Sequence, residues 1–300
     1  MLNVLQTPKD MAILTQIVQQ QTDLALDFIR TESYRHHFTP QTAQTVETLA
    51  AYQKQKRGES LRVGAKVQFN PQWQFVVVAS QQKQDAQQQL LHVKSQSRVL
   101  STALRYDADK WWVGSVLQVN NTTLTMDRMA YIGHSVHQQS AETDAESRSM
   151  GLFAGYEWRL NALGVALIAD LNKSKTEVAA FSEQKPGITQ MQFATRTTKS
   201  VKSGVGVDLR YQAVSWQPYV TARWVKEWHN DLPTIQASLN GSTFTTVLPP
   251  QDNQWVNIVA GLQFKPLNSG LHANLGFSRD LSRKASLLHS TFHASIGFVF

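Results

Sequence analysis

The sequence contains no cysteine, which excludes disulfide bridges and thiolate metal sites. It has no run of about 18 consecutive apolar residues, which excludes a membrane-spanning helix. Acidic residues are outnumbered, 22 against 29 Lys and Arg, but the cations form no basic block that would indicate a nucleic-acid partner. Residues 1–30 lack the ordered charged, apolar and cleavage segments of a signal peptide. The chain is therefore either cytosolic or a fragment of a mature protein, and the remaining pattern favours the fragment.

Aromatic residues and strict alternation are what the sequence does contain. Eight Trp, seven Tyr and thirteen Phe accompany a mean hydropathy of only −0.31. From about residue 59 onward, apolar and polar residues alternate in runs that are separated by short turns. Period-two alternation bounded by turn residues predicts half-buried antiparallel strands. The clearest pairs of runs flank residues 70–72, 107–110, 159–162, 212–215 and 265–270.

Longer polar segments separate these hairpins, and their Gln, Ser, Thr and Asn content predicts loops. Short turns at one end and long loops at the other are typical of an outer-membrane barrel. No internal repeat of fixed period is present, which disfavours a propeller. The predicted loops are residues 83–96, 121–147, 174–198 and 230–251.

The two strand faces decide between a soluble and a membrane barrel. One face is apolar and carries aromatic residues such as Trp73, Trp111 and Trp216 beside the short turns, as expected of an interfacial aromatic girdle. The other face mixes both charge signs with small residues. A solvated soluble surface would also explain these charges, but the aromatic distribution favours a membrane barrel with a polar lumen. The expected lumen-facing charges are Arg62, Lys66, Arg105, Glu157, Asp170, Lys202, Asp208, Arg210 and Arg223.

Counting strands backward from Phe300 gives the topology. Residues 60–69 become the second of twelve strands, and residues 45–54 are the only nearby candidate for the first, although their alternation is poor. An even number of strands allows closure, which leaves no unpaired edge in lipid. The predicted fold class is all-β: a 12-stranded antiparallel transmembrane β-barrel, over residues 41–300.

The first forty residues predict a linker with a helix. Thr7, Pro8 and Asp10 suit a helix start, and apolar residues follow at helical spacing around a polar run at 19–23. About 23 residues at about 1.5 Å each match the membrane thickness. Their polar side chains exclude lipid contact, so we expect the helix to plug the lumen; a surface or coiled-coil helix is the alternative. The expected lumen-helix residues are Leu14, Ile17, Val18, Asp23, Asp27 and Arg30, of which the charged ones would pair with lumen charges.

A helix, twelve alternating strands and a terminal aromatic residue resemble, in that order, the translocator β-domain of the autotransporters of type V secretion. The similarity is greatest to GDSL-type esterase autotransporters. The resemblance rests on LRVGAKVQF, MGLFAGYEWRLN, GVGVDLRYQ, PYVTARWVKEWHNDLPTIQASLNGSTFTT and STFHASIGFVF.

This resemblance implies a monomeric, integral protein of the Gram-negative outer membrane that exports an N-terminal passenger and anchors it at the cell surface. It also implies outer-membrane lipid, periplasmic chaperones and the barrel-assembly machinery as partners. That machinery reads a C-terminal strand, and the implied assembly signal is the outward set Phe292, Ala294, Ile296, Phe298 and Phe300.

Candidate catalytic and metal-binding groups are weak. No Gly-Asp-Ser-Leu block occurs, so the family's esterase chemistry is not carried over, and we expect neither enzyme activity nor a cofactor. Ser295 lies mid-strand, where the turn of a nucleophile elbow is missing. The pairs at 36–37 and at 134 and 137 are predicted to be solvent-facing His residues. Residues 8–40 contain no Asn, which disfavours the autocatalytic linker cleavage that some members use.

Three other functions remain open at this point. A diffusion porin would use the same barrel without needing a plug, and conductance with and without residues 1–40 would distinguish the two. An outer-membrane adhesin or surface hydrolase would place its chemistry in the loops, where we identify no convergent acidic or histidine set. A soluble lipid-carrying barrel would stay monodisperse without detergent.

Overall fold

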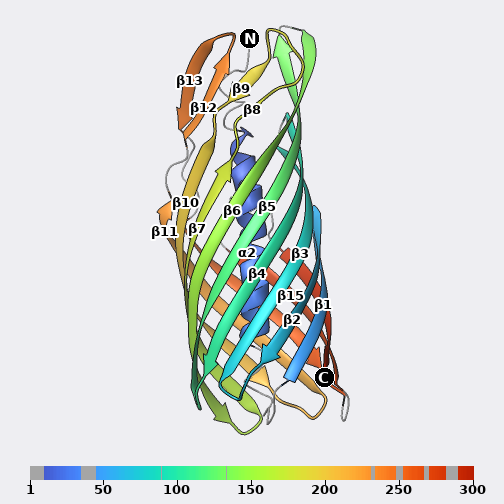
Figure 1. Ribbon diagram of the computed structural model, residues 1–300, viewed down its shortest axis with the longest axis vertical. Coiled ribbons are helices and arrows are strands. Elements are labelled where there is room, and N and C mark those ends of the chain that lie inside the picture. The colour runs from blue at the N-terminus through green and yellow to red at the C-terminus, as the bar shows by residue number, and fades with distance from the viewer. Residues whose placement is uncertain are drawn as a thin grey trace.

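The computed structural model describes residues 10–34, 45–88, 90–132, 134–230, 234–247, 253–266, 270–281 and 290–300. They form a closed barrel of twelve strands with one helix running inside it, and a small four-stranded sheet lies at one end (Figure 1). The strand order around the barrel is β1-β16-β15-β14-β11-β10-β7-β6-β5-β4-β3-β2. The predicted fold class, a 12-stranded antiparallel barrel with an N-terminal helix in its lumen, is confirmed.

The helix and strands have the following bounds. Helix α2 is Ala12–Tyr34. The barrel strands are β1 (Thr45–Gln55), β2 (Gly58–Gln68), β3 (Trp73–Gln88), β4 (Leu91–Asp107), β5 (Trp111–Ile132), β6 (Ser135–Leu160), β7 (Leu163–Val178), β10 (Arg196–Tyr211), β11 (Trp216–Asn230), β14 (Gln254–Phe264), β15 (Leu271–Leu281) and β16 (Ser290–Val299). The small sheet contains β8 (Phe181–Ser182), β9 (Met191–Phe193), β12 (Thr234–Leu239) and β13 (Ser242–Val247).

The first strand closes the barrel. β1 pairs with β16 from Glu47 opposite Val299 to Gln55 opposite Thr291, and with β2 along its other edge. The first strand predicted at 45–54 is therefore confirmed. Its alternation is poor because Leu49 and Ala51 point inward and are buried, where an entirely polar lumen would require polar side chains.

The outer surface of the barrel carries a band of exposed apolar side chains. On β7, the outward residues from Leu163 to Leu171 are all apolar, and at the usual rise and tilt they cover about 20 Å, most of the roughly 25 Å apolar band of an outer-membrane barrel. Aromatic pairs lie beside the short turns, such as Trp73 and Tyr106 with ring centroids 5.0 Å apart. Such a large apolar surface would be a liability in water, and it suits lipid.

The predicted loops are mostly strand, which corrects the expectation of long loops at one end. β5 and β6 continue as a paired hairpin up to Ile132 and Ser135, and β1 and β2 are joined by residues 56–57 alone. Beyond the apolar band the alternation persists with its polarity reversed. Outward positions become polar, as at Thr123 and Thr125, while Leu124 between them is fully buried. The polar composition thus belongs to solvent-facing strand positions, which composition alone did not distinguish from loops.

The small sheet lies at the end of the barrel from which the helix begins (Figure 1). Its order is β13-β12-β9-β8, so it joins the connection between β7 and β10 to the one between β11 and β14. β12 and β13 form a hairpin at Asn240 and Gly241, whose φ values of 49° and 80° suit a two-residue turn. Arg128 of β5 holds this region through a bidentate pair with Glu183, at 2.6 and 2.7 Å.

The helix and the barrel run in a fixed relative direction. The amino end of α2 lies toward the small sheet, and the carboxyl terminus of the chain lies at the opposite end (Figure 1). β1 begins beside the end of β16, since Glu47 pairs with Val299. The predicted boundary between linker and barrel, at residues 40 and 41, falls outside the described residues.

The face assignment predicts opposite responses at two adjacent residues. Leu275 is 53% exposed on the outward face and Asn274 is 1% exposed on the inward face. We expect Leu275→Arg to destabilise the barrel, lowering its free energy of unfolding from lipid by about 2–4 kcal/mol, because it places a cation in the bilayer core. Asn274→Arg should act only through crowding in the lumen. Urea titrations in phospholipid vesicles measure both, and a larger loss at Asn274 would mean that the barrel is inside out.

Candidate functional site

The interface between helix α2 and the inner wall of the barrel is the most elaborate polar and apolar contact surface in the described residues. It changes chemistry along the helix. The amino-terminal third is apolar, a short middle part carries amides and hydroxyls, and the remainder has a charged side and an apolar side. These parts are called the apolar layer, the amide layer and the charged layer below.

The apolar layer surrounds the first turns of the helix. Ile13, Ile17 and Val18 are completely buried, and full burial of such a side chain contributes about 1.5–3 kcal/mol. Beyond the apolar band, the inner wall that surrounds these turns contributes apolar side chains. The enclosing residues include Ala86, Leu91, Val93, Leu124, Met126, Val178, Met191, Phe193, Ile235 and Ala237.

The amide layer is built on Gln21 and Thr22, from the polar run that interrupts the helical pattern. Gln21 Nε2 donates to Ser95 Oγ at 3.0 Å, and Ser97 Oγ donates back to Gln21 Oε1. Asn120 Nδ2 donates to Thr22 Oγ1 at 3.2 Å. Unpaired polar groups in such a buried position would be costly, so these bonds fix the height of the helix within the barrel.

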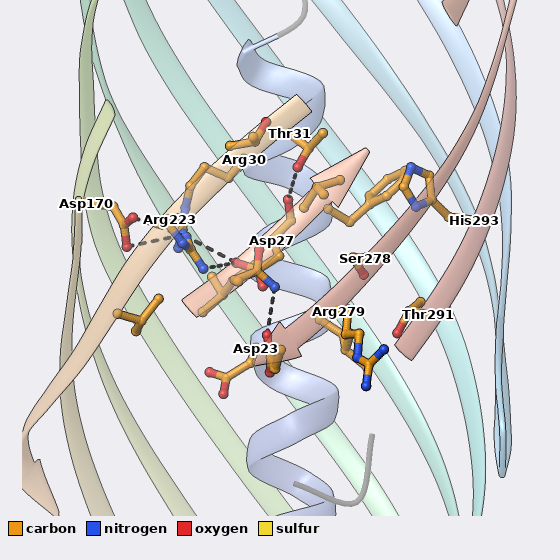
Figure 2. A pocket seen from close by; sticks show the side chains of 18 of the residues that line it. Asp23, Asp27, Arg30, Thr31, Asp170, Arg223, Ser278, Arg279, Thr291 and His293 are labelled. Atoms are coloured by element: carbon orange, nitrogen blue, oxygen red, sulfur yellow. Dashed lines mark hydrogen bonds and ion pairs between the residues drawn. The ribbon is translucent and has the colours of Figure 1, made fainter. Parts of the chain in front are cut away.

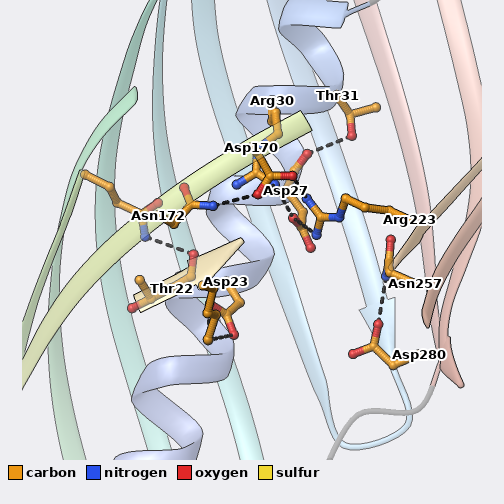
Figure 3. Close-up of polar contacts among 12 residues, drawn as sticks. Thr22, Asp23, Asp27, Arg30, Thr31, Asp170, Asn172, Arg223, Asn257 and Asp280 are labelled. Carbon is orange, nitrogen blue, oxygen red and sulfur yellow. Dashed lines mark hydrogen bonds and ion pairs between the residues drawn. The ribbon is translucent and has the colours of Figure 1, made fainter. Parts of the chain in front are cut away.

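The charged layer joins the helix to β7, β10 and β11, and Figure 3 shows its contacts with Asp170 and Arg223. Asp23 lies 2.7 Å from Lys202 Nζ, and Asp27 lies 2.9 Å from Arg223 Nη2. Arg30 approaches Asp170 at 3.2 Å, and Arg223 also reaches Asp170, at 3.1 Å. The spacing 23, 27, 30 places these three helical residues on one face. Each of the three predicted charges on the helix therefore meets an opposite charge on the wall.

The other side of the same helical turns is apolar. Leu26, Phe28 and Ile29 pack against inward-facing residues of β1, β3, β4 and β5. The guanidinium of Arg62 lies 4.5 Å from the centre of the Phe28 ring, a cation–π contact. Alternation does not predict this inward apolar patch, because it places residues such as Val76 and Val78 on the polar face and gives no clear face to residues 45–54. They are Leu49, Ala51, Val76, Val78, Ala103 and Val116.

The remaining predicted lumen charges are placed on the wall, and most pair along it. Lys66 Nζ lies 2.8 Å from Glu47 Oε2, whose other oxygen is 2.8 Å from His272 Nε2. Arg210 pairs with Asp208 at 2.6 Å. Likewise Arg105 pairs with Asp107, and Glu157 with Arg159. These ion pairs connect residues of the wall to one another, whereas Asp170, Lys202 and Arg223 connect the wall to the helix.

A cavity of about 130 Å³ separates the helix from part of the wall (Figure 2). It is lined by the charged layer and by residues of β14, β15 and β16, among them Asn257, Asp280 and His293. A polar space of this size holds several water molecules. The helix therefore fills the lumen unevenly, with apolar packing against residues of β1, β3, β4 and β5 and a polar space toward β14, β15 and β16.

Other candidate sites are not assembled in the described part of the chain. No group of three or more His, Asp or Glu residues there is arranged to hold a metal ion. Ser295 lies within strand β16, and His137 is exposed on β6. The pair at 36–37 lies outside the described residues. Among the described helices, none has the length and hydropathy needed to span a membrane.

The sequence and the fold are both similar to those of known proteins. The family model described as "Autotransporter beta-domain" matches residues 41–278. The translocator domain of the autotransporter NalP from Neisseria meningitidis superposes with a TM-score of 0.69 at 13% identity, covering 93% of this chain and 95% of that chain.

Two further solved structures are similar. The β-domain of the Bordetella autotransporter Brka gives a TM-score of 0.56 at 13% identity, covering 86% of this chain and 98% of that one. The Pseudomonas putida toluene transporter TodX gives 0.55 at 12%, covering 87% and 90%. At such identities these likenesses concern the fold alone. No curated protein matches the sequence.

The charged layer predicts that Arg223 contributes more to stability than an exposed arginine. Arg223→Leu removes both ion pairs and leaves Asp27 and the buried Asp170 with fewer partners. We expect a loss of about 1–3 kcal/mol, since a buried charged group is left less satisfied. Arg148→Leu is the control, because its pair with Glu146 is on the surface. Equal urea midpoints for the two variants would contradict a role for Arg223 in holding the helix.

Proposed function

We propose, for a chain that belongs to the autotransporter β-domain family, that helix α2 is the retained end of an exported passenger segment. The barrel is an outer-membrane translocator unit. In this proposal the polypeptide preceding the helix passes through the lumen, reaches the cell surface and stays attached there. The helix then remains in the lumen as both plug and anchor.

The direction of the helix is the single observation that carries this proposal. With an even number of strands, β1 begins and β16 ends at the same end of the barrel, and the helix runs toward that end (Figure 1). Its amino end therefore lies at the opposite end, where β5 and β6 extend beyond the apolar band. Any residues that precede the helix would leave the barrel on that side.

The lumen interface supports the anchoring part of the proposal. Burial of Ile13, Ile17 and Val18 and the ion pairs of Asp23 and Asp27 oppose withdrawal of the helix. A freely passing segment would gain nothing from side chains matched to the wall at three successive heights. The match favours a stationary helix once export has ended.

This proposal predicts where a reporter segment becomes accessible. A short protease-sensitive tag placed before residue 1, in a precursor exported to a Gram-negative outer membrane, should be cleaved by protease added to intact cells. The same tag in the turn at 108–110, between β4 and β5, should be protected, because that turn would face the periplasm. Cleavage at 108–110 with protection before residue 1 would reverse the orientation and contradict the proposal.

Assembly by the barrel-assembly machinery, after escort by periplasmic chaperones, is a second part of the proposal. The outward side chains of the last strand support it: Phe292, Ile296 and Phe298 are exposed and Phe300 is 72% exposed. They form a continuous row of apolar side chains along the outward face of β16, here called the apolar edge, which a receptor could bind before the barrel closes. The Phe298 and Phe300 rings are 4.8 Å apart, so the terminal residue extends this edge.

Phe300→Asp should therefore slow insertion into the outer membrane more than it destabilises the finished barrel. The charge interrupts the apolar edge at its end, whereas the ladder bond from the Phe300 N–H to the Val46 carbonyl is a backbone contact. Val299→Asp is the control, since it leaves the outward set unchanged. Pulse-labelled insertion measures the rate, and normal insertion of Phe300→Asp would rule out this signal.

The chemistry of the passenger is proposed from the resemblance alone. Similarity to GDSL-type esterase autotransporters supports an esterase, while the barrel itself belongs to a family whose β-domains are not typically catalytic. Hydrolysis of a chromogenic ester by intact cells that carry the complete gene, and its loss on protease treatment, would test this. Activity that survives complete removal of the surface passenger would contradict it.

A further inference from the structure

A group of cations lies on the outside of the barrel where the apolar band ends. On β6 the outward residues change from Met150 to Arg148, and on β7 from Leu171 to Lys173 and then Lys175. The change from apolar to basic residues lies at the end of the barrel where the small sheet and the amino end of α2 are found (Figure 1). On β10 and β11 the corresponding outward cations are Lys199 and Lys226. We call these five residues the basic patch.

The strand register brings three of these cations into one row. Arg148 is directly opposite Lys175, and Lys175 is directly opposite Lys199. Like charges in directly opposed positions of neighbouring strands destabilise a sheet. Such a row is favourable only if an anion reduces the repulsion.

Acidic neighbours reduce it only in part. Glu146 pairs with Arg148, and Glu177 pairs with Lys175 at 3.2 Å. No ion pair is found for Lys173 or Lys199 among the described residues. Five cations and two acids leave three positive charges in excess.

Around the rest of the barrel, outward cations of the described strands face acidic or neutral residues instead. Lys54 and Lys83 are both directly opposite the acidic Glu59, which lies between them. Arg98 lies between Gln81 and Asn121, both neutral. Among the described strand pairs, cations directly opposite other cations therefore occur only on one side of the barrel, over β6, β7 and β10.

We propose that the basic patch binds the phosphate groups of anionic lipids in the leaflet at this end of the barrel. The apolar side chains directly below it, Met150, Leu171 and Val205, would face acyl chains, so the cations stand at the height of the headgroups. Lysine and arginine near a membrane surface attract anionic headgroups in this way. A soluble anion would need the charges but not the apolar surface beneath them.

The test uses the full chain, refolded in detergent and titrated with fluorescent lipid A, a phosphorylated glycolipid. We expect Lys173→Gln, Lys175→Gln and Lys199→Gln together to weaken binding strongly, at about fivefold for each lysine removed. The matched control removes three cations elsewhere, with Lys54→Gln, Lys83→Gln and Arg98→Gln, and should bind as the unmodified chain does. Strand content and heat-modifiable migration establish that both variants are folded.

Three results would overturn the proposal. Equal losses in the two triple variants would indicate general charge attraction. Undiminished binding of dephosphorylated lipid A would exclude phosphate recognition. Inorganic phosphate that competes as well as the lipid would indicate a soluble anion as the ligand. Added salt should weaken binding to the unmodified chain more than to the patch variant, because these exposed charges are screened over about 8 Å at physiological ionic strength.

Discussion

Pairing of every backbone polar group within the protein is the constraint on which this structure depends, since lipid offers no hydrogen bonds. It requires the barrel to close, and closure depends on β1 pairing with β16. Once the sheet is closed, its two faces have separate solvents. The outer face meets lipid, and the inner face encloses a lumen that must be filled by water or by protein. The helix meets the second need, and its chemistry follows that of the wall.

The reversal of polarity above the apolar band explains why the helix changes character along its length. Within the band, inward positions such as Asp170 and Lys202 are charged, and the helix presents Asp23, Asp27 and Arg30. Beyond it, the barrel is built like a water-soluble sheet protein, with Leu124 inside and Thr123 outside. There the helix presents Ile13 and Ile17. The same helix is thus a polar plug in the membrane and a hydrophobic core element outside it.

Local patterning predicted the features that depend on one strand at a time. Alternation identified the outward residues of β16, and the strand count placed β1. Features that depend on pairing between distant segments are harder to predict from the sequence. Composition predicts loops for the Gln- and Thr-rich runs, because polar outward positions hide the alternation of buried Ala86 or Leu91. The charges of the helix were identified, yet the partner of Asp23 is set by how the helix is rotated, which no sequence period specifies. Inward Val76 and Val78 were missed because their burial depends on a helix far away in the chain.

The layered contacts between helix and wall have a mechanical consequence. A passenger dragged by flow or by an attached surface would pull α2 along its own axis, toward the end where the small sheet lies. The bonds to Ser95, Lys202 and Arg223 run across that axis at successive heights, so they would be loaded in shear and share the force. Contacts that were loaded one after another would instead break stepwise. The anchor is therefore strongest along the direction in which a surface-displayed segment would be pulled.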